Sequence, residues 1–506
     1  MKLRLPYVLG LLVVIALYSM KYHWSRRKMY AAASKMNGPR TLPLIGNAHS
    51  FCCKSEDVLQ KITSIIDEYN KDPIRFWLGP NLLVVLKNPI HLEKIMSSSK
   101  FAYKHELYEI FEEYVGDGLI SASGLKPKYK IHRRIFQPLF DIKFISSILG
   151  IMRTQMTICM DKLEEHVDKE TLDIHDMIFA CAGDIIGEAI LGMEMNNQRI
   201  GLSQFCRSVV EMLEMAYERL VKVWLQFDFI FNRLPIKKKS DEVIFVIHNF
   251  AEEALMVSFE RRNSSERDEA RFVPIIDTIS KFAESNPDII NHEDLVNHLI
   301  TFFPASADTS TIITSFAAVC FGMYPEYQEK AALEVRSIVG DQISEITLDQ
   351  IYKMEYLDMC MKDVLRLFPI APYILRRTVE DYALDKWILP KGTAIVVPIF
   401  NLHRDTAHWE NPEHFHPDHF LPEAVKNRHI YAYMPFSAGP RGCIGKTLAN
   451  IILKMFMANL LHRFEIQADG KVPDLQLKAD ISTRPKGGYY CRLKKREWKI
   501  NDTLMK

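Results

Sequence analysis

The sequence predicts a mainly α-helical protein with a small β region, built as a single large domain behind an N-terminal membrane anchor. Three observations support this fold class. Residues 55–370 carry long stretches of helical periodicity, strand signals are short, and an apolar stretch lies at the N-terminus. Length alone would allow about three domains, but no internal repeat is visible, and one large helical domain fits the pattern better.

Composition excludes several classes of protein. Hydrophobic residues make up 48% and charged residues 25% of the 506 positions, a balance that can bury a large core. The net charge of +1 gives no global field to attract nucleic acid, so no nucleic-acid partner is expected. The nine cysteines stand singly apart from Cys52 and Cys53, and no CxxC pair occurs. This pattern favours reduced thiols in a cytosol-facing protein over a disulfide scaffold.

The N-terminal apolar stretch, residues 5–18, is interrupted only by Pro6 and Gly10 and is followed by basic residues at 21–28. It is slightly short for a membrane span, which tilt and local thinning can accommodate. Lys2 and Arg4 leave a cleaved signal peptide as the alternative. The basic cluster on the far side favours a retained anchor with that side in the cytosol. We predict an anchor at residues 1–20, a basic and proline-rich connector at 21–47, and a globular domain at 48–506.

Within that domain, apolar periodicity predicts helices over residues 58–69, 144–166, 242–261, 295–323 and 326–339. A short strand signal lies at residues 395–397. Residues 261–271 are nearly all charged or small and predict a solvated loop. After Pro390 the chain becomes irregular and rich in proline, histidine and aromatic residues, a composition that is often functional in a compact domain.

The sharpest signal for chemistry is the segment at residues 436–445, which contains Gly439, Gly442 and Gly445 around Cys443. Glycines let the backbone approach something flat and bulky. A thiolate at Cys443 would be stabilised by nearby backbone N–H groups and by a helix that begins near Ile444. The alternative is a buried structural cysteine beside a glycine-rich turn, and for a lone cysteine that alternative would be preferred.

This segment resembles the haem-binding loop of the cytochrome P450 family, whose characteristic residues correspond to Phe436, Gly439, Arg441, Cys443 and Gly445. Ala449 stands where the family has a small residue that faces the haem. The resemblance extends from Gly38 to about Tyr490. It implies the family's mostly α fold and haem b (iron protoporphyrin IX) between two helices, with Cys443 as the iron ligand. A thiolate ligand favours O–O cleavage.

A second segment lies in the apolar run before Met323. Ala305, Asp308 and Thr309 fall at positions i, i+3 and i+4, which share one face of a helix. An acid beside a hydroxyl can relay protons to bound oxygen, whereas the alternative is a threonine that bonds back to a carbonyl. Because the position matches the family's oxygen-activation motif, we predict Asp308 and Thr309 as catalytic residues. Ser306 replaces the usual glycine, and Pro304 predicts a helix kink.

Three arginines are expected at the haem propionates, since guanidinium groups bond carboxylates with two N–H groups at once. They are Arg133, Arg376 and Arg441. Arg133 follows Tyr129, which stands where the family has tryptophan. One arginine alone would more simply be a surface charge, but three matched positions favour haem.

The supporting triad of the family is also altered. Asp363 and Arg366 resemble its Glu-x-x-Arg helix, and His419 occupies the place of its second arginine. The family's Glu-Arg-Arg network would therefore become an Asp-Arg-His network with a shorter acid and a titratable base. A contact between His419 and Asp363 would make haem retention sensitive to pH.

Residues 116–120 and 418–423 resemble microsomal family 4 and its insect relatives. Many family 4 members have a glutamate that bonds covalently to haem, and Ala305 at that position has no carboxylate. Aromatic residues at 224–231 either line a channel or pack in the core. Basic residues at 126–134 form either a docking surface for an acidic partner or a solvated helix face.

The resemblance implies a monooxygenase on the cytosolic face of the endoplasmic reticulum membrane. It would insert one atom of O₂ into a lipophilic substrate, such as a fatty acid, a hormone or a foreign compound. Electrons would come from NADPH through NADPH-cytochrome P450 reductase, with cytochrome b5 as a second possible donor. Two alternatives stay open on the same fold: a haem isomerase or dehydratase, which needs no O₂, and a non-catalytic haem-binding protein. The substitutions at 129, 304, 306, 363 and 419 leave the last one open.

Overall fold

The structure is a computed structural model that describes residues 4–69, 71–122, 127–264 and 272–498. The first helices are α1 Arg4–Ser25, α2 Arg27–Ala33, α3 Val58–Glu68, α4 Pro89–Met96 and α5 Glu109–Val115. Those in the middle of the chain are α6 Pro127–Phe136, α7 Ile142–Ser147, α8 Leu149–Glu164, α9 His175–Ile186, α10 Asn197–Ile200, α11 Gln204–Val221, α12 Asp228–Phe231, α13 Pro235–Asn263 and α14 Ile275–Ser285. The last are α15 His292–Met323, α16 Pro325–Val339, α17 Leu348–Lys353, α18 Glu355–Leu367, α19 Ile399–Leu402, α20 Pro422–Asn427 and α21 Lys446–Arg463.

Within the described residues, the β region consists of four small sheets. The largest has the strand order β1-β2-β7-β4, in which β2 and β7 are parallel and the outer pairs are antiparallel. Its strands are β1 Ile74–Leu78, β2 Asn81–Val85, β7 Ala394–Val397 and β4 Ile374–Arg377. A second sheet has the order β3-β11-β8, with β3 Leu172–Asp173, β11 Tyr490–Lys495 and β8 Phe464–Gln467. Two hairpins complete the set, β5 Tyr382–Leu384 with β6 Trp387–Leu389, and β9 Leu477–Asp480 with β10 Ser482–Pro485.

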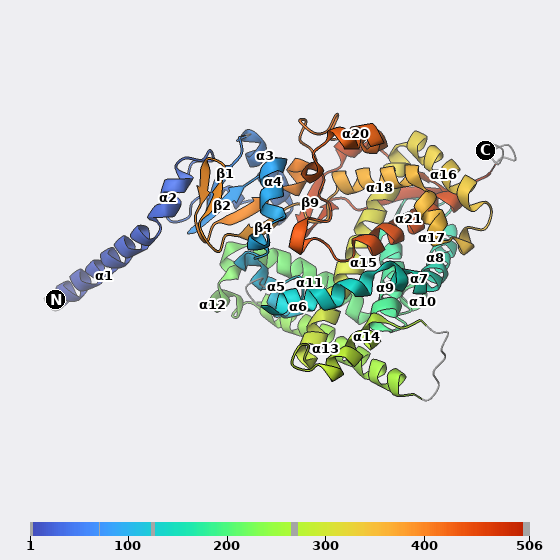
Figure 1. Ribbon diagram of the computed structural model, residues 1–506, viewed down its shortest axis with the longest axis horizontal. Helices are drawn as coiled ribbons and strands as arrows, with labels where there is room; N and C mark the ends of the chain where they lie inside the picture. The colour runs from blue at the N-terminus through green and yellow to red at the C-terminus, as the bar shows by residue number, and fades with distance from the viewer. Residues whose placement is uncertain (1–3, 70, 123–126, 265–271, 499–506) are drawn as a thin grey trace.

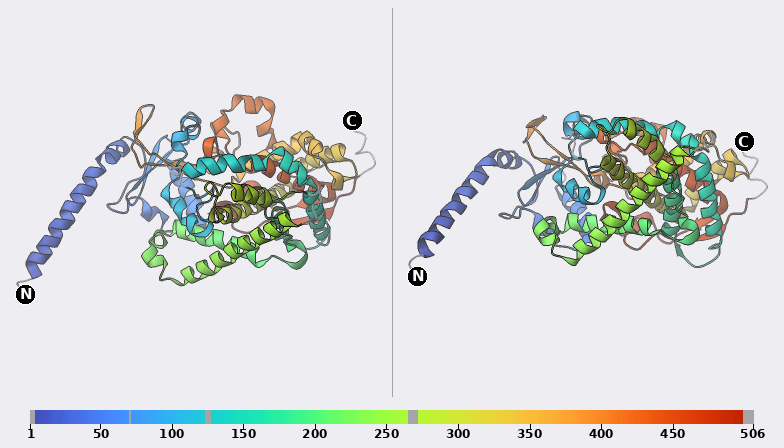
Figure 2. Two further views of the ribbon diagram at one scale, coloured as in Figure 1. Left: turned by 60° about the horizontal axis from the view of Figure 1, so that its bottom comes forward. Right: turned by 90° about the horizontal axis from the view of Figure 1, so that it is seen from below.

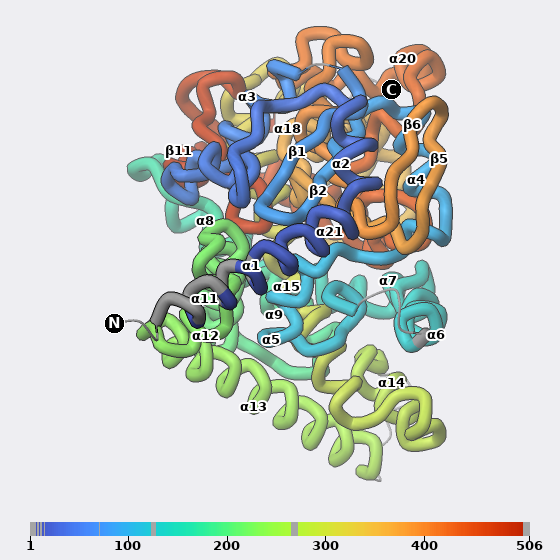
Figure 3. Tube along the Cα trace, turned by 90° about the vertical axis from the view of Figure 1, so that its left-hand side faces the viewer, coloured from blue at the N-terminus to red at the C-terminus, as the bar shows by residue number. Residues whose placement is uncertain are grey.

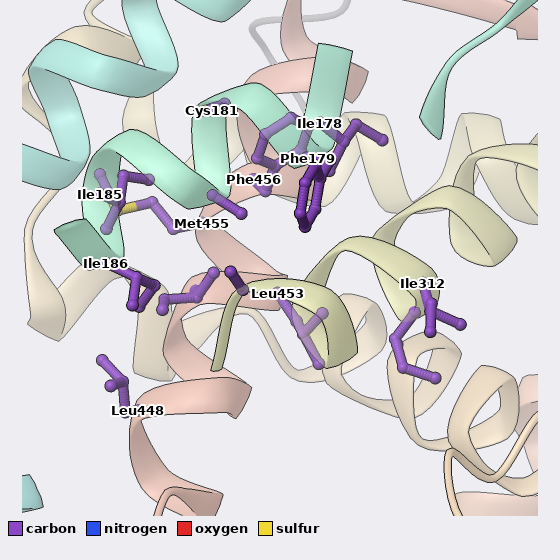
Figure 4. Close-up of a cluster of buried hydrophobic side chains, with 14 of the residues drawn as sticks. Ile178, Phe179, Cys181, Ile185, Ile186, Ile312, Leu448, Leu453, Met455 and Phe456 are labelled. Carbon is purple, nitrogen blue, oxygen red and sulfur yellow. The ribbon is translucent and has the colours of Figure 1, made fainter. Parts of the chain in front are cut away.

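Helix α15 runs through the middle of the helical body, with the sheet β1-β2-β7-β4 at the end nearer the N-terminus (Figure 1). A capping box starts it, because the Asn291 side chain accepts from the Asp294 N–H and the Asp294 carboxylate accepts from the Asn291 N–H. Most of its side chains are buried against α9, α21, α13 and α18. Figure 4 shows part of this core, where Ile185 and Ile186 of α9 lie near Leu453 and Met455 of α21. The predicted fold, mainly helical with small sheets, is confirmed.

Several element predictions needed correction. The single helix expected at 144–166 is interrupted at Ile148, between α7 and α8. The helix expected to end at residue 261 continues as α13 to Asn263. Arg261 is not solvated as expected for the segment 261–271, because its guanidinium forms hydrogen bonds with Asp277 at 2.6 and 2.7 Å. The remainder of that predicted loop, residues 265–271, lies outside the described residues.

The N-terminal helix α1 projects from the body in every view (Figures 1 and 2). Within the described part of the chain, no helix is both long enough and apolar enough to cross a membrane. The span predicted at residues 1–20 is therefore not confirmed. The apolar run in α1 is only about 14 residues long, whereas a membrane span needs about 20. Lys21, His23 and Ser25 follow the run.

The predicted connector is more ordered than proline and glycine suggested. Its basic half forms the end of α1 and all of α2, and Lys28 makes an ion pair with Asp381 at 2.9 Å beside the β5-β6 hairpin. Ala33 and Met36 are buried in the same apolar cluster as Trp77. Part of the predicted connector therefore packs on the globular body.

Candidate haem-thiolate site

Cys443 lies in an irregular loop between α20 and α21, two residues before Gly445, which caps α21. The Cys443 N–H donates to the Phe436 carbonyl at 3.0 Å, which closes the loop on itself. Ala449, one turn into α21, donates its N–H to the Gly445 carbonyl at 2.8 Å. Phe436, Gly445, Ala449 and Cys443 therefore form one compact unit at the start of a helix, as predicted.

Gly439 is required for a reason that the sequence did not indicate. Its φ is +66°, a region that side chains disfavour, and a Cβ there would overlap the carbonyl oxygen of Met96 at the end of α4. Gly445 differs, because a Cβ at that position would meet only the Cys443 sulfur, at 3.9 Å. The close approach at Gly439 is thus made to backbone of α4, and only Gly445 has the open surroundings that a flat ligand would need.

The Cys443 side chain is exposed, whereas Cys320 and Cys360 in the neighbouring helices are buried. Burial by the surrounding protein still raises the pKa of its thiol, while the Gly445 N–H and the charges of Arg133 and Lys446 lower it. Cys443 is therefore open on one side, while protein atoms surround it on the others. An uncovered thiol with positive charges and a helix N-terminus nearby is suited to bind a metal as thiolate.

Arg376 and Arg441 are buried close to this loop, with exposed fractions of 3% and 9%. Arg441 donates to the carbonyls of Ala102 and Ala122 at 2.7 Å each and stacks over the Tyr129 ring at 3.3 Å. Arg376 donates to the Leu375 carbonyl at 2.9 Å. Burial lowers the pKa of both guanidinium groups, in Arg441 to about 10. Among the described residues, neither arginine has a carboxylate within ion-pair distance.

Lys104 and Arg133 add to the same positive cluster. The Lys104 ammonium donates to the Ile120 carbonyl and lies 4.2 Å from the Tyr108 ring centroid. Burial and the charges of Arg441 and Arg376 hold the pKa of Lys104 well below its ordinary value. Arg133 donates to the Tyr129 hydroxyl at 3.2 Å, and that hydroxyl donates to the Pro440 carbonyl at 3.0 Å. Tyr129 thus joins α6 to the cysteine loop in place of the expected tryptophan.

These residues fit the predicted cofactor. Arg376 and Arg441 are buried without a carboxylate among the described residues, and because buried charges without a counter-ion are costly, an anionic ligand would stabilise them. A porphyrin with two propionates would supply two negative charges beside Arg133, Arg376 and Arg441, while its iron faced the uncovered Cys443 sulfur. Lys104 is a member of this cluster that sequence reasoning missed, because a lone lysine in a loop carries no motif.

On α15, the described side chains from Asp294 to Gly322 are buried except Ala305, Ser306 and Thr309, which are partly exposed. The helix continues through Pro304, although proline cannot donate to the Ile300 carbonyl. The Thr309 hydroxyl donates to the Ala305 carbonyl at 2.8 Å. This is the bond to a backbone carbonyl that the alternative, structural role of Thr309 predicted. It lies on the partly exposed face of α15.

Asp308 does not lie beside the Thr309 hydroxyl as expected. Its carboxylate is buried, with 3% exposed, and Oδ1 accepts from Arg484 Nη2 at 2.6 Å. No hydrogen bond joins Asp308 to Thr309 among those found for the described residues. The two predicted catalytic residues are thus neighbours in sequence that face different partners. Sequence reasoning missed Arg484, which lies in a short β-hairpin near the C-terminus.

The altered triad is assembled as the sequence predicted. Asp363 and Arg366 are fully buried and joined by Nε–Oδ1 and Nη2–Oδ2 hydrogen bonds of 2.6 and 3.1 Å. His419 Nδ1 lies 2.9 Å from Asp363 Oδ1, and its Nε2 lies 2.6 Å from the Glu410 carbonyl. His403, also buried, joins the Arg366 carbonyl to the Met434 N–H at 3.1 and 2.9 Å. This network therefore links α18 to the segment that leads into the cysteine loop.

Two other expectations can be compared with the structure. The aromatic residues at 224–231 largely face outward, with Trp224 56% and Phe229 66% exposed, so most of them neither line a channel nor pack in the core. Lys128 is not a free docking charge, because its ammonium pairs with the buried Asp294. Lys126 lies outside the described residues. Gly118 packs against α15, where a Cβ would overlap the Thr301 hydroxyl.

Comparison with known proteins agrees with this site. The family model Cytochrome P450 matches residues 36–492. The chain is 30% identical over 500 residues to Cytochrome P450 4V2 of Homo sapiens, covering 97% of this chain and 94% of the relative. It is 28% identical over 517 residues to Cytochrome P450 4c3 of Drosophila melanogaster, covering 97% and 95%. Over 487 residues it is 28% identical to Cytochrome P450 4c21 of Blattella germanica, covering 94% and 96%.

Proposed function

The chain belongs to the cytochrome P450 family and is an oxidoreductase of the monooxygenase type, and from this premise we propose how it works. It inserts one atom of O₂ into a lipophilic substrate, with electrons from NADPH delivered by NADPH-cytochrome P450 reductase. The observation that carries the proposal is the exposed Cys443 beside the buried Arg376 and Arg441, which have no carboxylate within ion-pair distance among the described residues. Reductase-dependent NADPH consumption coupled to product formation tests it. Neither an isomerase nor a non-catalytic haem protein would show that coupling.

Each residue of the site has a distinct task in this proposal. Cys443 provides the sulfur ligand, and Phe436, Gly439, Gly445 and Ala449 hold its loop and the start of α21 against the cofactor. Arg133, Arg376 and Arg441 bind the two propionates, with Lys104 beside them. Bound haem b with a thiolate ligand supplies oxygen activation. Because Ala305 carries no carboxylate, haem is expected to be extractable with acid and organic solvent.

Thr309 is proposed to hold a proton at Oγ1 on the open face of α15. Thr309→Ala is expected to raise peroxide release relative to product by about 10-fold or more, because general acid–base groups contribute about 10²–10⁴-fold. The measurement is peroxide and product per NADPH consumed. Thr309→Ser retains the hydroxyl and should stay close to the wild type.

Thr311 provides a matched control for that experiment. Its hydroxyl makes the same kind of bond, to the Ala307 carbonyl at 2.7 Å, but the side chain is fully buried. Thr311→Ala should leave the peroxide-to-product ratio unchanged. Equal ratios in wild type and Thr309→Ala would instead mean that the Thr309 hydroxyl is only a structural group.

The proposed location is the cytosolic face of the endoplasmic reticulum membrane. Support comes from outward-facing apolar side chains at one end of the molecule, on α1 (Val13, Leu17) and on the segment containing Trp224, Phe227 and Phe229, all more than half exposed. Figure 3 shows α1 and α12 on the face of the molecule turned to the viewer. Scattered apolar residues need no explanation, whereas a group of them supports the proposed contact with a membrane.

Deleting residues 1–20 is expected to release at least part of the protein from microsomal membranes with unchanged haem content. Among the described side chains, the first buried one is Ala33, so the deletion should leave the core intact. The measurement is partitioning between supernatant and pellet after a high-salt wash. If the deleted protein stays fully bound, α1 does not hold it, and Trp224→Ser with Phe229→Ser would identify the second surface.

The substrate class rests on family membership and on the apolar lining usual for such sites. Fatty acids, hormones and foreign lipophiles are all compatible with this chain. Cytochrome b5 is a further proposed electron donor. Difference spectra of the purified protein against a panel of lipophiles would separate these substrate classes.

A further inference from the structure

We propose that Arg484 is a positioning residue that holds the Asp308 carboxylate away from Thr309, and that Asp480 competes with Asp308 for its guanidinium. The inference rests on the proposed function, since it concerns the proton-handling side chains of the same site. It assigns a role to two residues of the β9-β10 hairpin that no motif in the sequence marks.

The contacts define a shared arginine. Arg484 Nη2 donates to Asp308 Oδ1 at 2.6 Å, and Nε donates to Asp480 Oδ1 at 2.7 Å. The side chains of Asp308, Arg484 and Asp480 are 4%, 14% and 18% exposed, so solvent screens these charges weakly. One guanidinium thus serves two carboxylates from different elements, α15 and β9.

A third contact completes the surroundings of Arg484. Its Nη1 lies 3.2 Å from His175 Nε2, on the first turn of α9. Arginine can only donate, so His175 Nε2 is the acceptor and carries no proton in this arrangement. The proton on Nδ1 then points at Asp176 Oδ1, 3.3 Å away on the molecular surface. No proton passes through Arg484, because a guanidinium is not deprotonated in proteins; its role is to place a charge.

Helix geometry explains why this placement matters. Adjacent residues point about 100° apart around an α-helix. Thr309 lies on the partly exposed face with Ala305, whereas Asp308 points to the hairpin and is buried. The Asp308 carboxylate must turn away from Arg484 before it can serve the Thr309 hydroxyl. The strength of the contact with Arg484 therefore sets how easily the acid becomes available.

Asp480 adjusts that strength. Burial and the Asp308 charge raise the pKa of Asp480 to about 6, against the opposing effects of Arg484 and Lys478. Below that pH, Asp480 is neutral and Asp308 is the sole carboxylate that pairs with the guanidinium, so the interaction between Asp308 and Arg484 is strong. Above it, the two carboxylates share the charge and Asp308 is released more easily. Tyr489, His175 and Asp173 also face this cluster, and burial raises the pKa of Tyr489.

The first test needs no catalysis. Urea unfolding of the holoprotein is followed for wild type, Asp308→Asn, Arg484→Gln and the double variant, and the coupling between the two side chains is taken from the cycle. We expect stronger coupling at about pH 5 than at about pH 7.5, since the ionised fraction of Asp480 rises about tenfold between them. With Asp480→Asn in all four proteins, the coupling should be equal at both pH values.

A matched control is the exposed pair Arg492 and Asp469, joined by hydrogen bonds of 2.7 and 3.1 Å. Its coupling should be weak and the same at both pH values. If the coupling of Asp308 with Arg484 is likewise independent of pH in the wild type, Asp480 does not compete and the proposal is overturned.

The second test asks whether the interaction between Asp308 and Arg484 affects the ratio of peroxide to product. In the wild type, the peroxide-to-product ratio should fall as pH rises through about 6. In Asp480→Asn it should stay at the high, acidic value throughout. If the pH profile of Asp480→Asn is identical to that of the wild type, the pair of Asp308 and Arg484 is only structural, and Arg484 has no positioning role. If the wild type forms no product at any pH, the proposed function fails instead, and the unfolding cycle alone decides whether Asp480 controls the hold.

Discussion

Replacing Cys443 with serine is expected to abolish the red-shifted Soret band of the reduced carbonyl complex. That band reports a thiolate on the iron, and Cys443 is the cysteine whose sulfur is uncovered in the loop before α21. Serine is close in size, and its hydroxyl is a poor iron ligand at neutral pH. Because the loop is closed by the backbone bond from Cys443 to Phe436, which the variant retains, the fold should persist. The measurement is the carbonyl difference spectrum, with circular dichroism for the fold.

The control is a second exposed cysteine. Cys52→Ser changes a thiol in the segment before α3 and should leave both the spectrum and the haem content unaltered. Surface substitutions of this kind change stability by less than about 0.5 kcal/mol. A red-shifted band that survives in Cys443→Ser would show that the sulfur ligand has been assigned wrongly.

The cysteine loop could be predicted because its constraints are local. Cys443, Phe436 and Gly445 lie within ten residues, and the backbone bond and the helix start that unite them act over that distance. The reason for Gly439 could not be predicted, because the atom that excludes a side chain there belongs to Met96, on a distant helix. Motif spacing identifies such a position but not its cause.

Helix α15 shows what the sequence could not predict. Periodicity correctly places Asp308 and Thr309 in a long buried helix. It cannot tell which of two adjacent residues faces the open side, since that depends on a partner 176 positions away, Arg484. A buried carboxylate takes the nearest buried cation, and only the tertiary structure brings that cation into place.

Some surface charges were over-interpreted for a related reason. Arg261 and Lys128 look like solvated charges in sequence, but each meets a buried aspartate, Asp277 and Asp294. Composition predicts exposure only on average, and a single long-range ion pair reverses it.

Asp363→Ala is expected to prevent stable folding and haem retention. The substitution leaves Arg366 fully buried without its carboxylate and removes an acceptor from His419 and from the His416 N–H, which donates to Asp363 at 2.7 Å. Breaking a buried pair from one side costs about 3–5 kcal/mol, a large fraction of the roughly 5–15 kcal/mol that holds a domain folded. The measurements are soluble yield, haem content and the urea midpoint.

Asp349 on the preceding helix α17 provides the control, because it pairs with Lys353 at 2.6 Å and is 75% exposed. Asp349→Asn should cost no more than about 1 kcal/mol. Comparable losses in both variants would mean that this part of the fold is sensitive to the loss of any carboxylate, and that the triad is not a special support.

The pH dependence of this triad follows from the charges that face Asp363. Burial raises the pKa of Asp363, but the Arg366 charge and the hydrogen bonds from His419 and Arg366 outweigh it, so the pKa lies below its ordinary value. A depressed acid contributes stability above its unfolded pKa, and that stability is lost as pH falls through the folded value. Haem loss from the wild type should therefore accelerate at strongly acidic pH.

His419 faces two acceptors, the Asp363 carboxylate at 2.9 Å and the Glu410 carbonyl at 2.6 Å. His419→Ala removes both contacts and should lose haem faster than the wild type, whereas His419→Arg offers N–H donors to the same oxygens and should retain haem as well as the wild type. Asp363→Glu combined with His419→Arg should be non-additive, since the two side chains touch. The measurement is the rate of haem loss from the wild type, the single variants and the double variant. Strictly additive effects would show that the histidine does not support the carboxylate, and that the replacement of the family's arginine has no consequence for haem retention.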